Sequence, residues 1–592
     1  MLNPAGRPDL PRWIERQPLA DVPLLPGFHP LLARLLANRG FRTVEEARNF
    51  LSPKLTQLGD PDQIPGCSAA AQLLVAAVKA GRPVVIYGDY DVDGVTASAV
   101  LFHMLKLAGA QVATYVPDRF AEGYGLNAEA LLAIHAAGAP LIVSVDCGIT
   151  AIEPVAAAKA AGAALIITDH HTPAADGALP AADAVVHPGL PGSTADARLC
   201  GVGVAYKLAW AFAKAWCGSE RLPEVWSHLL VDLLAFVALG TIADVGEMLG
   251  ENRVLVSYGL RRLSAAPAGV PHLEGLRALV AATRLENKQI DDVKVGFTLA
   301  PQINAVGRMG HAGEAVELFT TARGERTREL AEVLAACNEE RKAVQRRIEG
   351  EAERQVLENG WNAPEHRAIV VAAPAFAGGN TEEGWHAGVV GIVASKLVEK
   401  FHRPAVVGCI NADGSVKFSA RSVSGVNLHG ALGDCGDLLT FGGHAMAAGG
   451  TIKAGSLEAF RAALSRRVAL DLQAEDLCGK LNYDLEASTR DCTVEVFTQI
   501  AQLAPFGVGN PTPRLRVRGT VREVRPLGQG GKHLSVHLEA EGVWLAVKAW
   551  NAAQALAGAV PGTSLDMIGK AVVNDFNGRV SAEVHWEGGV AG

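Results

Sequence analysis

The 592-residue sequence lacks several features that mark secreted, membrane-spanning and histone-like proteins. Its nine cysteines are an odd number without a Cys-x-x-Cys pair, so we expect reduced thiols in a cytosolic protein, with no disulfide framework or zinc knuckle. Apolar runs are short or carry a charge, and no basic stretch precedes one at the start, so we expect no membrane span and no signal peptide. The net charge of −8 argues against coating of nucleic acid by bulk positive charge, although a groove needs only local charge.

The chain is too long for one hydrophobic core, which usually stops near about 250–300 residues, so we predict roughly three or four domains. Residues 1–60 are predicted to be a helical lead-in. Alternating apolar strands and helices over 61–324 predict an α/β fold with a doubly wound parallel sheet. The charge-rich stretch 325–358 is predicted to be a connecting helix. A smaller α/β pattern follows over 359–475, and short strands over 476–592 predict a β-barrel such as an OB-fold.

The segment 88–94 reads GDYDVDG and follows an apolar, strand-like run. Asp89, Asp91 and Asp93 cannot all be buried and ionised without a cation to pair with them. An EF-hand calcium loop opens with the same spacing, but its twelfth position is Val100 where a bidentate Glu is needed, and a strand precedes the segment. A turn rich in Asx residues is the structural alternative, and three acids beside one apolar strand disfavour it.

Two further apolar runs end in the same kinds of side chain, Asp146 in one and the triplet Asp169-His170-His171 in the next. A lone strand-end Asp is often a helix cap, and a lone His is more often structural than catalytic, but three successive strand ends favour a functional site. Oxygen and imidazole ligands without thiolate suit Mn²⁺ or Mg²⁺, and such a cluster can hold two ions about 3.5–4 Å apart. Asp244, which follows a long apolar helix, could close the site.

These motifs occur in the order found in the DHH phosphoesterase superfamily, which the sequence resembles. Other segments are similar to one branch of it, the bacterial RecJ family, so that the resemblance covers nearly the whole chain. The matching segments are GDYDVDG, DRFAEGYGLN (118–127), Asp146, the DHH triplet, CGVGVAYKL (200–208), ALGTIADV (238–245), PQINAVGRMG (301–310), WHAGVVGIVASKL (385–397), FSARS (418–422), GGHAMAAGG (442–450) and LAPFGVGNPTP (503–513). The resemblance implies that 61–324 is a DHH catalytic domain, 359–475 a DHHA1 domain and 476–592 an OB-fold nucleic-acid-binding domain.

The resemblance also implies roles for the strand-end residues. Asp91, Asp93, Asp146, His170 and Asp244 match metal ligands. Related pyrophosphatases carry a His where this chain has Tyr87, so either Asp89 covers the missing ligand or nothing does. The catalytic residues are expected to be His171, Asp169 and Asp146. His171 is expected to stabilise charge at the scissile phosphate or protonate the leaving oxygen, with Asp169 orienting its neighbours.

A second set of residues is expected to bind nucleic acid. Arg119 and Tyr124 suit a terminal 5′-phosphate, because Arg makes bidentate charge-assisted bonds to phosphate. Six basic residues and one acid between 514 and 532 suit a groove that tracks a phosphate backbone, since alternating residues of a strand share a face. The alternative for that stretch is an ordinary solvated strand. The complete set is Arg119, Tyr124, Asn304, Arg308, Ser419, Arg421, Gly443, His444, Arg514, Arg516 and Arg518.

Taken together, the sequence predicts a 5′→3′ exonuclease specific for single-stranded DNA, which uses two Mn²⁺ or Mg²⁺ ions and acts in recombination and repair. Two alternatives stay open, a phosphodiesterase of short oligonucleotides or cyclic dinucleotides, and a non-catalytic DNA-binding scaffold. The resemblance implies single-stranded DNA with a 5′ end, a single-strand-binding protein and a RecQ-type helicase as partners. It also implies a monomer in the bacterial cytoplasm, without a membrane association.

Overall fold

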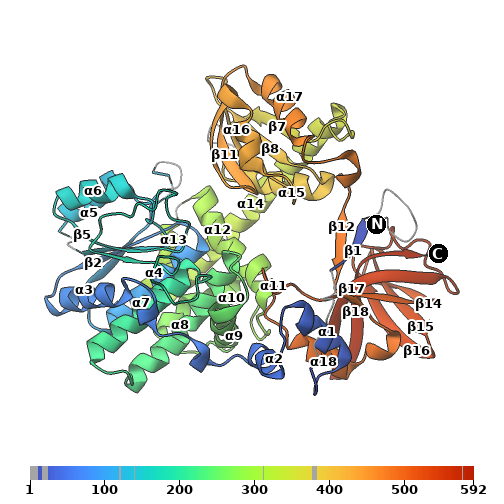
Figure 1. Cartoon of the computed structure of the whole chain (residues 1–592), viewed down its shortest axis with the longest axis horizontal. Helices are drawn as coiled ribbons and strands as arrows, with labels where there is room; N and C mark the ends of the chain where they lie inside the picture. The colour runs from blue at the N-terminus through green and yellow to red at the C-terminus, as the bar shows by residue number, and fades with distance from the viewer. Residues whose placement is uncertain are drawn as a thin grey trace. The chain divides into compact units, whose positions relative to one another are not determined.

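The computed structural model describes residues 11–16, 25–118, 122–123, 125–138, 141–310, 312–376, 383–576 and 578–591. The chain divides into two compact units, whose elements are labelled in Figure 1. The parallel-sheet unit contains residues 44–338 and 502–512. The barrel unit contains residues 1–43, 339–501 and 513–592. Neither unit is continuous in the sequence.

One sheet of parallel strands organises the parallel-sheet unit. In spatial order its strands are β3 (Val112–Tyr115), β2 (Val84–Gly88), β4 (Leu141–Val145), β5 (Ala164–Thr168) and β6 (Ala184–Val186). Strands β2 and β4 are buried at every residue, because apolar runs of this kind are covered on both faces. Gly88 pairs with Val145, and Val145 with Thr168, so the carboxyl ends of β2, β4 and β5 lie side by side.

Helices cover both faces of this sheet, so the predicted doubly wound fold is confirmed. The larger core includes residues of α3 (Cys67–Lys79), α4 (Val92–Leu107), α7 (Gly201–Cys217), α8 (Glu224–Ala243) and α9 (Gly250–Ser264). A separate core on the other face includes residues of α5 (Ala128–Ala136) and α6 (Ile152–Ala160). Asn127 caps α5, since its side chain accepts hydrogen bonds from the backbone N–H groups of Glu129 and Ala130.

Helix α8 corrects one expectation from the sequence. Its 20 residues include a window with a mean hydropathy of 1.8, so by length and composition this helix is able to cross a membrane. The same window is 72% buried within the fold. The hydrophobicity of α8 is therefore accounted for by its place in the core, where Leu233, Leu234 and Phe236 are fully buried.

The rest of the parallel-sheet unit is helical. Its remaining elements are α2 (Val44–Leu51), η1 (Leu55–Gln57), η2 (Pro61–Gln63), η3 (Pro271–Leu273), α10 (Glu274–Ala282), α11 (Asp292–Lys294), η4 (Val295–Leu299), α12 (Ala300–Met309) and α13 (Gly313–Thr320). Elements α11, η4 and α12 follow one another without a break, and η4 is a π-helical turn of the kind often found at functional sites. The predicted connecting helix is confirmed as α14 (Glu325–Glu358), which begins in this unit and ends in the barrel unit.

The barrel unit contains α1 (Pro30–Asn38) and a second sheet. Its strands, in spatial order, are β10 (Leu439–Gly443), β11 (Ala447–Ile452), β9 (Val416–Arg421), β8 (Ala405–Ile410) and β7 (Ile369–Pro374). The helices that accompany it are α15 (Val390–Phe401), α16 (Leu428–Gly433), η5 (Gly436–Leu438), α17 (Leu457–Val468) and η6 (Ala474–Asp476). Only β7 and β8 pair in parallel among these strands, so this sheet is mixed.

The predicted carboxyl-terminal barrel is confirmed. Its sheet runs through β13 (Leu485–Glu486), β14 (Arg514–Leu527), β15 (His533–Ala540), β16 (Val543–Ala549), β18 (Arg579–Ala591) and β17 (Ser564–Phe576). Strand β17 also pairs with β14, which closes the sheet on itself. Two helices, η7 (Thr489–Asp491) and α18 (Val494–Ala501), lie between β13 and β14 in the sequence. A separate parallel pair joins β1 (Arg12–Glu15) to β12 (Lys480–Tyr483).

Candidate metal centre and nucleic-acid surface

The carboxyl ends of three neighbouring strands bring the predicted acidic residues together. Asp89 follows β2, Asp146 follows β4 and Asp169 follows β5. Because these strands are adjacent and parallel, their ends meet at one edge of the sheet. Asp146 has a left-handed backbone with φ of 62°, an unusual conformation for a residue other than glycine.

Two helix starts hold the other acids of the first motif. Asp91 caps α4, where its carboxylate accepts a hydrogen bond from the Gly94 N–H at 3.0 Å. Asp93 lies in the first turn of α4 and accepts bonds from the start of α7, at 2.7 Å from the Gly201 N–H and 2.9 Å from the Val202 N–H. The amino end of α7 therefore fixes both oxygens of Asp93 and favours its negative charge.

His170 lies at the centre of this cluster. Its Nε2 is 3.1 Å from Asp146 Oδ1, 3.7 Å from Asp244 Oδ2 and 3.8 Å from Asp93 Oδ2. Asp244 reaches the cluster from the carboxyl end of α8, whose cap it forms. The structure thus brings together the six residues that the sequence predicts as metal ligands, namely Asp89, Asp91, Asp93, Asp146, His170 and Asp244.

The donor atoms form overlapping sets, within each of which all atoms lie within 4.8 Å of one another. The sets are Asp89, Asp91 and Asp146; Asp146, His170 and His171; and His170, Cys200 and Asp244. Asp146 belongs to two of them, as a ligand shared by two ions would. Within the described residues, neither the buried Asp146 Oδ1 nor the buried His170 Nε2 has a hydrogen-bond partner, as expected of atoms that bind a cation.

The electrostatics of the cluster also call for cations. Burial, followed by the charges of Asp244 and Asp91, raises the pKa of Asp93 well above its ordinary value. Burial and the charges of neighbouring carboxylates do the same to the pKa of Asp146, and burial with the charge of Asp91 raises the pKa of Asp244 to about 6. Burial lowers the pKa of His170 to about 4, which keeps its imidazole neutral and able to bind a metal. Divalent cations would stabilise the ionised carboxylates, so these residues fit a metal centre.

Sequence reasoning missed Cys200, which belongs to one donor set. Its thiol is buried and makes a hydrogen bond to Asp244. Burial and the charges of Asp93 and Asp244 raise the pKa of this thiol, which favours its neutral form. The other donors of the sets are oxygen and imidazole, which favour Mn²⁺ or Mg²⁺. The segment CGVGVAYKL (200–208) carries part of the family resemblance but does not indicate a ligand, because only the folded chain brings Cys200 to Asp244.

Glycines allow the helices to approach the carboxylates closely. A Cβ added at Gly201 would lie 2.4 Å from Asp146 Oδ1, and one at Gly240 would lie 2.8 Å from Asp93 Oδ1. A Cβ at Gly94 would lie 2.5 Å from the Asp89 carbonyl oxygen. These glycines are required for space at the cluster, since none of the three has a positive φ.

His171 and Asp169 form a pair at the edge of the cluster. Asp169 Oδ1 lies 2.7 Å from His171 Nδ1 and accepts the N–H groups of His170 and His171, while Oδ2 accepts the Ile149 N–H at 2.9 Å. Burial alone would lower the pKa of His171, but the hydrogen bond to Asp169 and its charge raise it to about 9. His171 is therefore protonated near neutral pH, and its side chain is 44% exposed. Asp169 bonds to protein groups through both oxygens, which suits orientation of its neighbours.

A cavity of about 310 Å³ lies beside the acidic cluster. Asp89 and Asp91 line it on one side, and Asn304 and Arg308 of α12 line it on the other. The structure thus places two of the predicted nucleic-acid-binding residues next to the metal centre. Arg119 and Tyr124 lie outside the described residues.

Four other predicted residues are gathered in the second sheet of the barrel unit. Ser419 and Arg421 lie on β9, where they pair with Gly449 and Ala447 of β11. Gly443 ends β10 and His444 follows it, both are exposed, and the His444 N–H donates to the Ala447 carbonyl. Gly443 has φ of 140°, and a Cβ there would lie 2.5 Å from that carbonyl oxygen. Ser419 and Arg421 are therefore separated from Gly443 and His444 by strand β11, within the same sheet.

The arginine-rich strand differs from the expected basic groove. Arg514, Arg516 and Arg518 alternate along β14, yet each is paired with a carboxylate. Arg516 and Arg518 share Asp566 at 2.7 and 2.9 Å, and Arg514 pairs with Glu587. Neighbouring strands thus supply the acids that the local sequence lacks, so most of the predicted positive charge of this face is neutralised.

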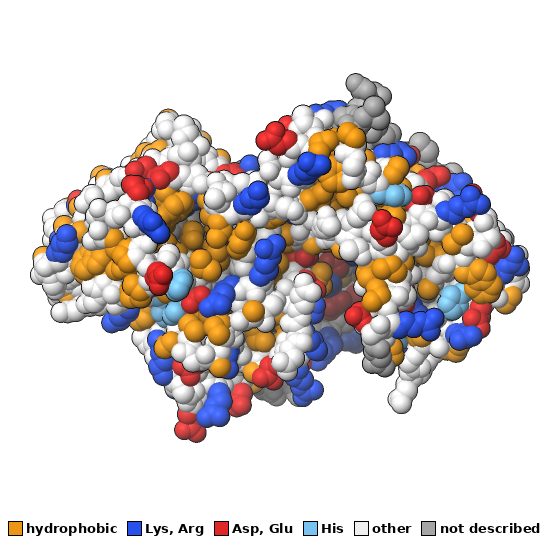
Figure 2. Space-filling view, turned by 90° about the horizontal axis from the view of Figure 1, so that it is seen from below, with side chains coloured by type: hydrophobic (Ala, Val, Ile, Leu, Met, Phe, Trp, Pro, Cys, Tyr) orange, Lys and Arg blue, Asp and Glu red, His pale blue; other side chains and the backbone are white. Residues whose placement is uncertain are grey.

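Two aromatic residues of the barrel, Trp544 and Trp550, are 61% and 50% exposed. Figure 2 shows acidic and basic side chains interspersed on the face that it displays, in keeping with a net charge of −8.

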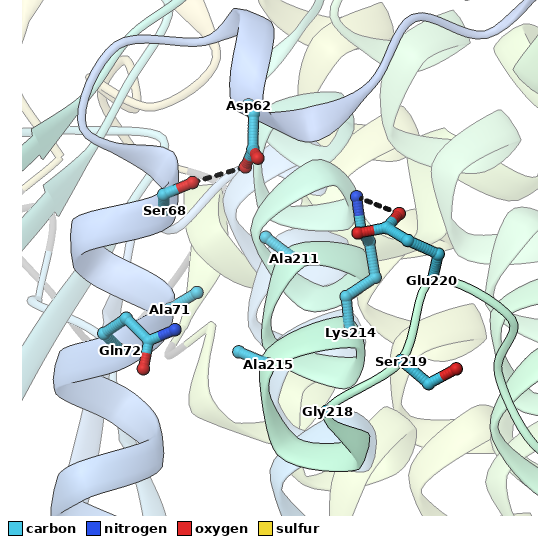
Figure 3. Close-up of a pocket in the computed structure, with 10 residues that line it drawn as sticks. All are labelled: Asp62, Ser68, Ala71, Gln72, Ala211, Lys214, Ala215, Gly218, Ser219 and Glu220. Carbon is cyan, nitrogen blue, oxygen red and sulfur yellow. Dashed lines mark hydrogen bonds and ion pairs between the residues drawn. The ribbon is translucent and has the colours of Figure 1, made fainter.

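A second hollow, of about 280 Å³, lies between α3 and α7 (Figure 3). Small side chains such as Ala71 and Ala211 line it, and its charged groups are already paired. Lys214 Nζ lies 2.7 Å from Glu220 Oε2 and 2.9 Å from Asp60 Oδ2. None of its lining residues belongs to the metal-type donor sets, so this hollow is not the metal centre.

Comparison with known proteins agrees with this geometry. Family models match the DHH family N-terminal domain over residues 83–241, the DHHA1 domain over 368–470 and the RecJ OB domain over 483–588. The single-stranded-DNA-specific exonuclease RecJ of Dickeya dadantii is 34% identical over 89% of this chain and 89% of that protein. The same-named protein of Bacillus subtilis is 39% identical over 93% of this chain, which spans 66% of its length.

Solved structures add the metals. The crystal structure of RecJ from Thermus thermophilus in complex with Mn²⁺ matches with a TM-score of 0.78 and 30% identity, and it covers 98% of this chain and 79% of that one. A structure of the same protein in complex with Mg²⁺ matches with a TM-score of 0.73. The fold, the metal-type cluster and the relatives agree, and the chain belongs to the RecJ family of single-stranded-DNA-specific exonucleases.

Proposed function

We propose that this chain hydrolyses single-stranded DNA from its 5′ end, by a mechanism that uses two Mn²⁺ or Mg²⁺ ions, in DNA recombination and repair. The observation that carries the proposal is the pair of donor sets that share Asp146, with buried ligand atoms that have no hydrogen-bond partner among the described residues. A non-catalytic scaffold needs no such constellation. When bound, the ions would offset negative charge on the phosphate and lower the pKa of the attacking water.

Each residue of the cluster has a part that follows from its contacts. Asp91, Asp93, Asp146, His170 and Asp244 would hold the ions, with Asp89 as a further ligand in the set that includes Asp91. The amino end of α7 orients Asp93 before any ion binds, because two backbone N–H groups occupy its oxygens. The chain therefore presents a ligand set whose geometry is fixed by strand ends and helix starts.

His171 would act on the departing group. Its Nδ1 lies 2.7 Å from Asp169 Oδ1, which fixes the orientation of the imidazole ring. A protonated imidazole at this position stabilises negative charge on the scissile phosphate and can donate a proton to the leaving oxygen. Asp169 then serves as a positioning residue, and Asp146 acts through the ions that it holds.

The proposed DNA-binding residues include polar groups beside the acidic cluster. Asn304 and Arg308 line the cavity beside Asp89 and Asp91, where a phosphate next to the cleaved bond would lie. Arg119 and Tyr124 are proposed for the terminal 5′-phosphate. Further nucleic-acid-binding residues are proposed in the barrel unit, namely Ser419, Arg421, Gly443, His444, Arg514, Arg516 and Arg518.

The division into five parts expected from the sequence stays a prediction, as do the cytoplasmic location and the monomeric state. A single-strand-binding protein and a RecQ-type helicase are proposed as partners, because an exonuclease for single strands needs duplex to be opened and single strands to be delivered. Copurification of either protein with the full chain from bacterial extract would test this part of the proposal.

End-labelled DNA tests the function directly. Single strands labelled at the 5′ or the 3′ end, and the matching duplex, are incubated with Mn²⁺ or with chelator. We expect early release of labelled nucleotide from the 5′ end of the single strand alone, and only with metal present. Early release from the 3′ end, equal rates on duplex, or activity with chelator would contradict the proposal. Cleavage of short oligonucleotides or cyclic dinucleotides alone would favour the small-substrate alternative.

A further inference from the structure

The segment 502–512 connects two parts of the barrel unit but belongs to the parallel-sheet unit. It leaves the barrel unit after α18 and returns to it at the start of β14. We call this segment the strap. A simple linker between α18 and β14 would need no buried contacts with the parallel-sheet unit. The strap makes such contacts, and we therefore ask what they hold in place.

Arg253 of α9 anchors the strap. Its side chain is 2% exposed, and its guanidinium donates to the carbonyl oxygens of four consecutive strap residues at distances of 2.9 to 3.2 Å. The acceptors are Gln502, Leu503, Ala504 and Pro505. Its Nε also donates to the Phe50 carbonyl, and the guanidinium lies 3.7 Å from the centre of the Phe50 ring. The carbonyl oxygens replace the hydrogen bonds to water that the guanidinium loses on burial. Because each of them must stay within reach of the guanidinium, the path of the strap backbone is fixed.

Asn510 closes the strap on itself. The side chain is fully buried, and its Nδ2 donates to the carbonyl oxygens of Leu503 and Pro505 at 2.7 and 2.9 Å. Backbone bonds between Gly507 and Asn510 run in both directions. The strap is therefore a fixed loop, and its tip at Val508 faces the segment that follows helix α8.

The tip and the middle of the strap contact two elements that line the metal centre. The Met248 N–H donates to the Val508 carbonyl at 2.7 Å, four residues after Asp244. The Phe506 N–H donates to the Asp292 carboxylate, at the start of the helical run that ends in α12. That run carries Asn304 and Arg308 into the cavity beside the acidic cluster. The strap thus holds, from outside the cavity, a loop that bears a metal ligand and a helix that bears substrate-binding candidates.

We propose that the strap positions the catalytic site, and that Arg253 and Asn510 are positioning residues for the reaction. This inference rests on the proposed function. The strap fixes the loop after Asp244 against the α11–α12 run, so a looser strap lets the ligand and the phosphate-binding side chains move relative to each other. Misplacement by about 1 Å at such a site can cost about 100-fold in rate. Loss of anchorage is therefore expected to lower turnover and weaken metal binding more than it weakens DNA binding.

Arg403 offers a matched control in the barrel unit. It is 4% exposed, and its guanidinium donates to carbonyl oxygens of the loop 361–366, including Asn362 at 3.0 Å and Ala363 at 2.9 Å. Arg253→Lys and Arg403→Lys therefore remove the same kind of anchor, a buried fork that holds several carbonyls, and Lys offers only a compact point charge in each place. The two variants of the full chain are compared by kcat and KM on single-stranded DNA and by Mn²⁺ titration, with calorimetry as a readout that does not need activity.

For Arg253→Lys we expect kcat to fall about tenfold or more with KM within about twofold, and the Mn²⁺ dissociation constant to rise about threefold or more. For Arg403→Lys we expect all three values to stay within about twofold at a similar loss of melting temperature. If the two variants behave alike, the strap proposal is overturned. If Arg253→Lys does not fold, Asn510→Ala, which keeps the Arg253 anchor, decides by the same criteria. If the wild-type chain has no nuclease activity, the proposed function is overturned instead. The strap proposal is then tested by the Mn²⁺ dissociation constants of the two variants alone.

Discussion

Gly201 at the start of α7 is expected to be essential for activity although its side chain is a single hydrogen. Its N–H donates to Asp93, and a Cβ in its place would lie 2.4 Å from Asp146 Oδ1 and 2.6 Å from Asp146 Cβ and Cγ. Gly201→Ala keeps the backbone donor and adds one methyl group against the ligand that two donor sets share. The substitution therefore tests the space around Asp146 and leaves the chemistry of the site unchanged.

The magnitude follows from the overlap. Ordinary contact begins at 3.4 Å, so the Asp146 carboxylate would have to shift by about 1 Å, and a shift of that size can cost about 100-fold in rate. Stability should change little. Overpacking costs about 1–3 kcal/mol, while alanine is more favourable than glycine in a helix by about 1 kcal/mol. We therefore expect about 100-fold lower kcat/KM with a free energy of unfolding lowered by no more than about 2 kcal/mol.

The assay is nucleotide release from 5′-labelled single-stranded DNA, measured over a range of Mn²⁺ concentrations. Gly203→Ala is the matched control, since it lies one position beyond Val202 in the same helix and its added Cβ would meet Leu199 Cδ2 at 3.1 Å. The flexible end of Leu199 can move away, so we expect Gly203→Ala to keep activity within about threefold. Gly201→Ala activity equal to that of Gly203→Ala, at an unchanged Mn²⁺ dependence, would refute the reasoning.

Three further predictions can be checked in parallel. Asp146→Ala should abolish cleavage and the Mn²⁺-induced rise in melting temperature while single-stranded DNA still binds, and surviving activity would mean that the site is wrongly assigned. Arg518→Gln should change the slope of log affinity for single-stranded DNA against log salt concentration by well under about 1, because Asp566 already pairs with this guanidinium at 2.9 Å. A change of about one full unit would show that Arg518 binds a phosphate directly. Burial lowers the pKa of His103 to about 3, below its unfolded value near 6.5, so its stabilising effect is complete above pH 6.5 and is lost as the pH falls. Urea unfolding measures the free energy of unfolding at about pH 7 and at about pH 4.5. The decrease between these two pH values should be about 2–3 kcal/mol smaller in His103→Gln than in the wild type, and equal decreases would contradict this reasoning.

The metal centre was predictable because it follows a simple rule of parallel sheets. Asp89, Asp146 and Asp169 each come directly after an apolar run, and strands of that kind align their carboxyl ends. The continuous helix over 325–358 was equally clear, since no proline interrupts its charged pattern. Asp244 was a weaker inference from the residues alone, because the end of a helix has no fixed relation to a sheet edge until the helix is packed.

Other features depended on contacts between distant residues, which local patterns do not encode. Cys200 joins the cluster only because α7 begins beside Asp244, and Arg516 loses its free charge to Asp566, which is 50 residues away. Strands β10 and β11 are rich in glycine and lack an apolar alternation, so they were not foreseen. The attachment of the strap to the parallel-sheet unit was hidden for the same reason, since it depends on distant residues such as Arg253 on α9 and Met248.

The parallel pair of β1 and β12 has a consequence for how the protein is made. Arg12 pairs with Lys480, and Arg16 donates to Asp484 across 468 positions of the sequence. At synthesis rates of about 5–20 residues per second, the ribosome needs roughly 20–90 s to produce the partner of the first strand. During that time β1 is an unpaired edge able to join other chains, whereas the parallel-sheet unit can form most of its core. The yield of native protein should therefore depend on how well this short amino-terminal strand is protected from other chains while synthesis continues.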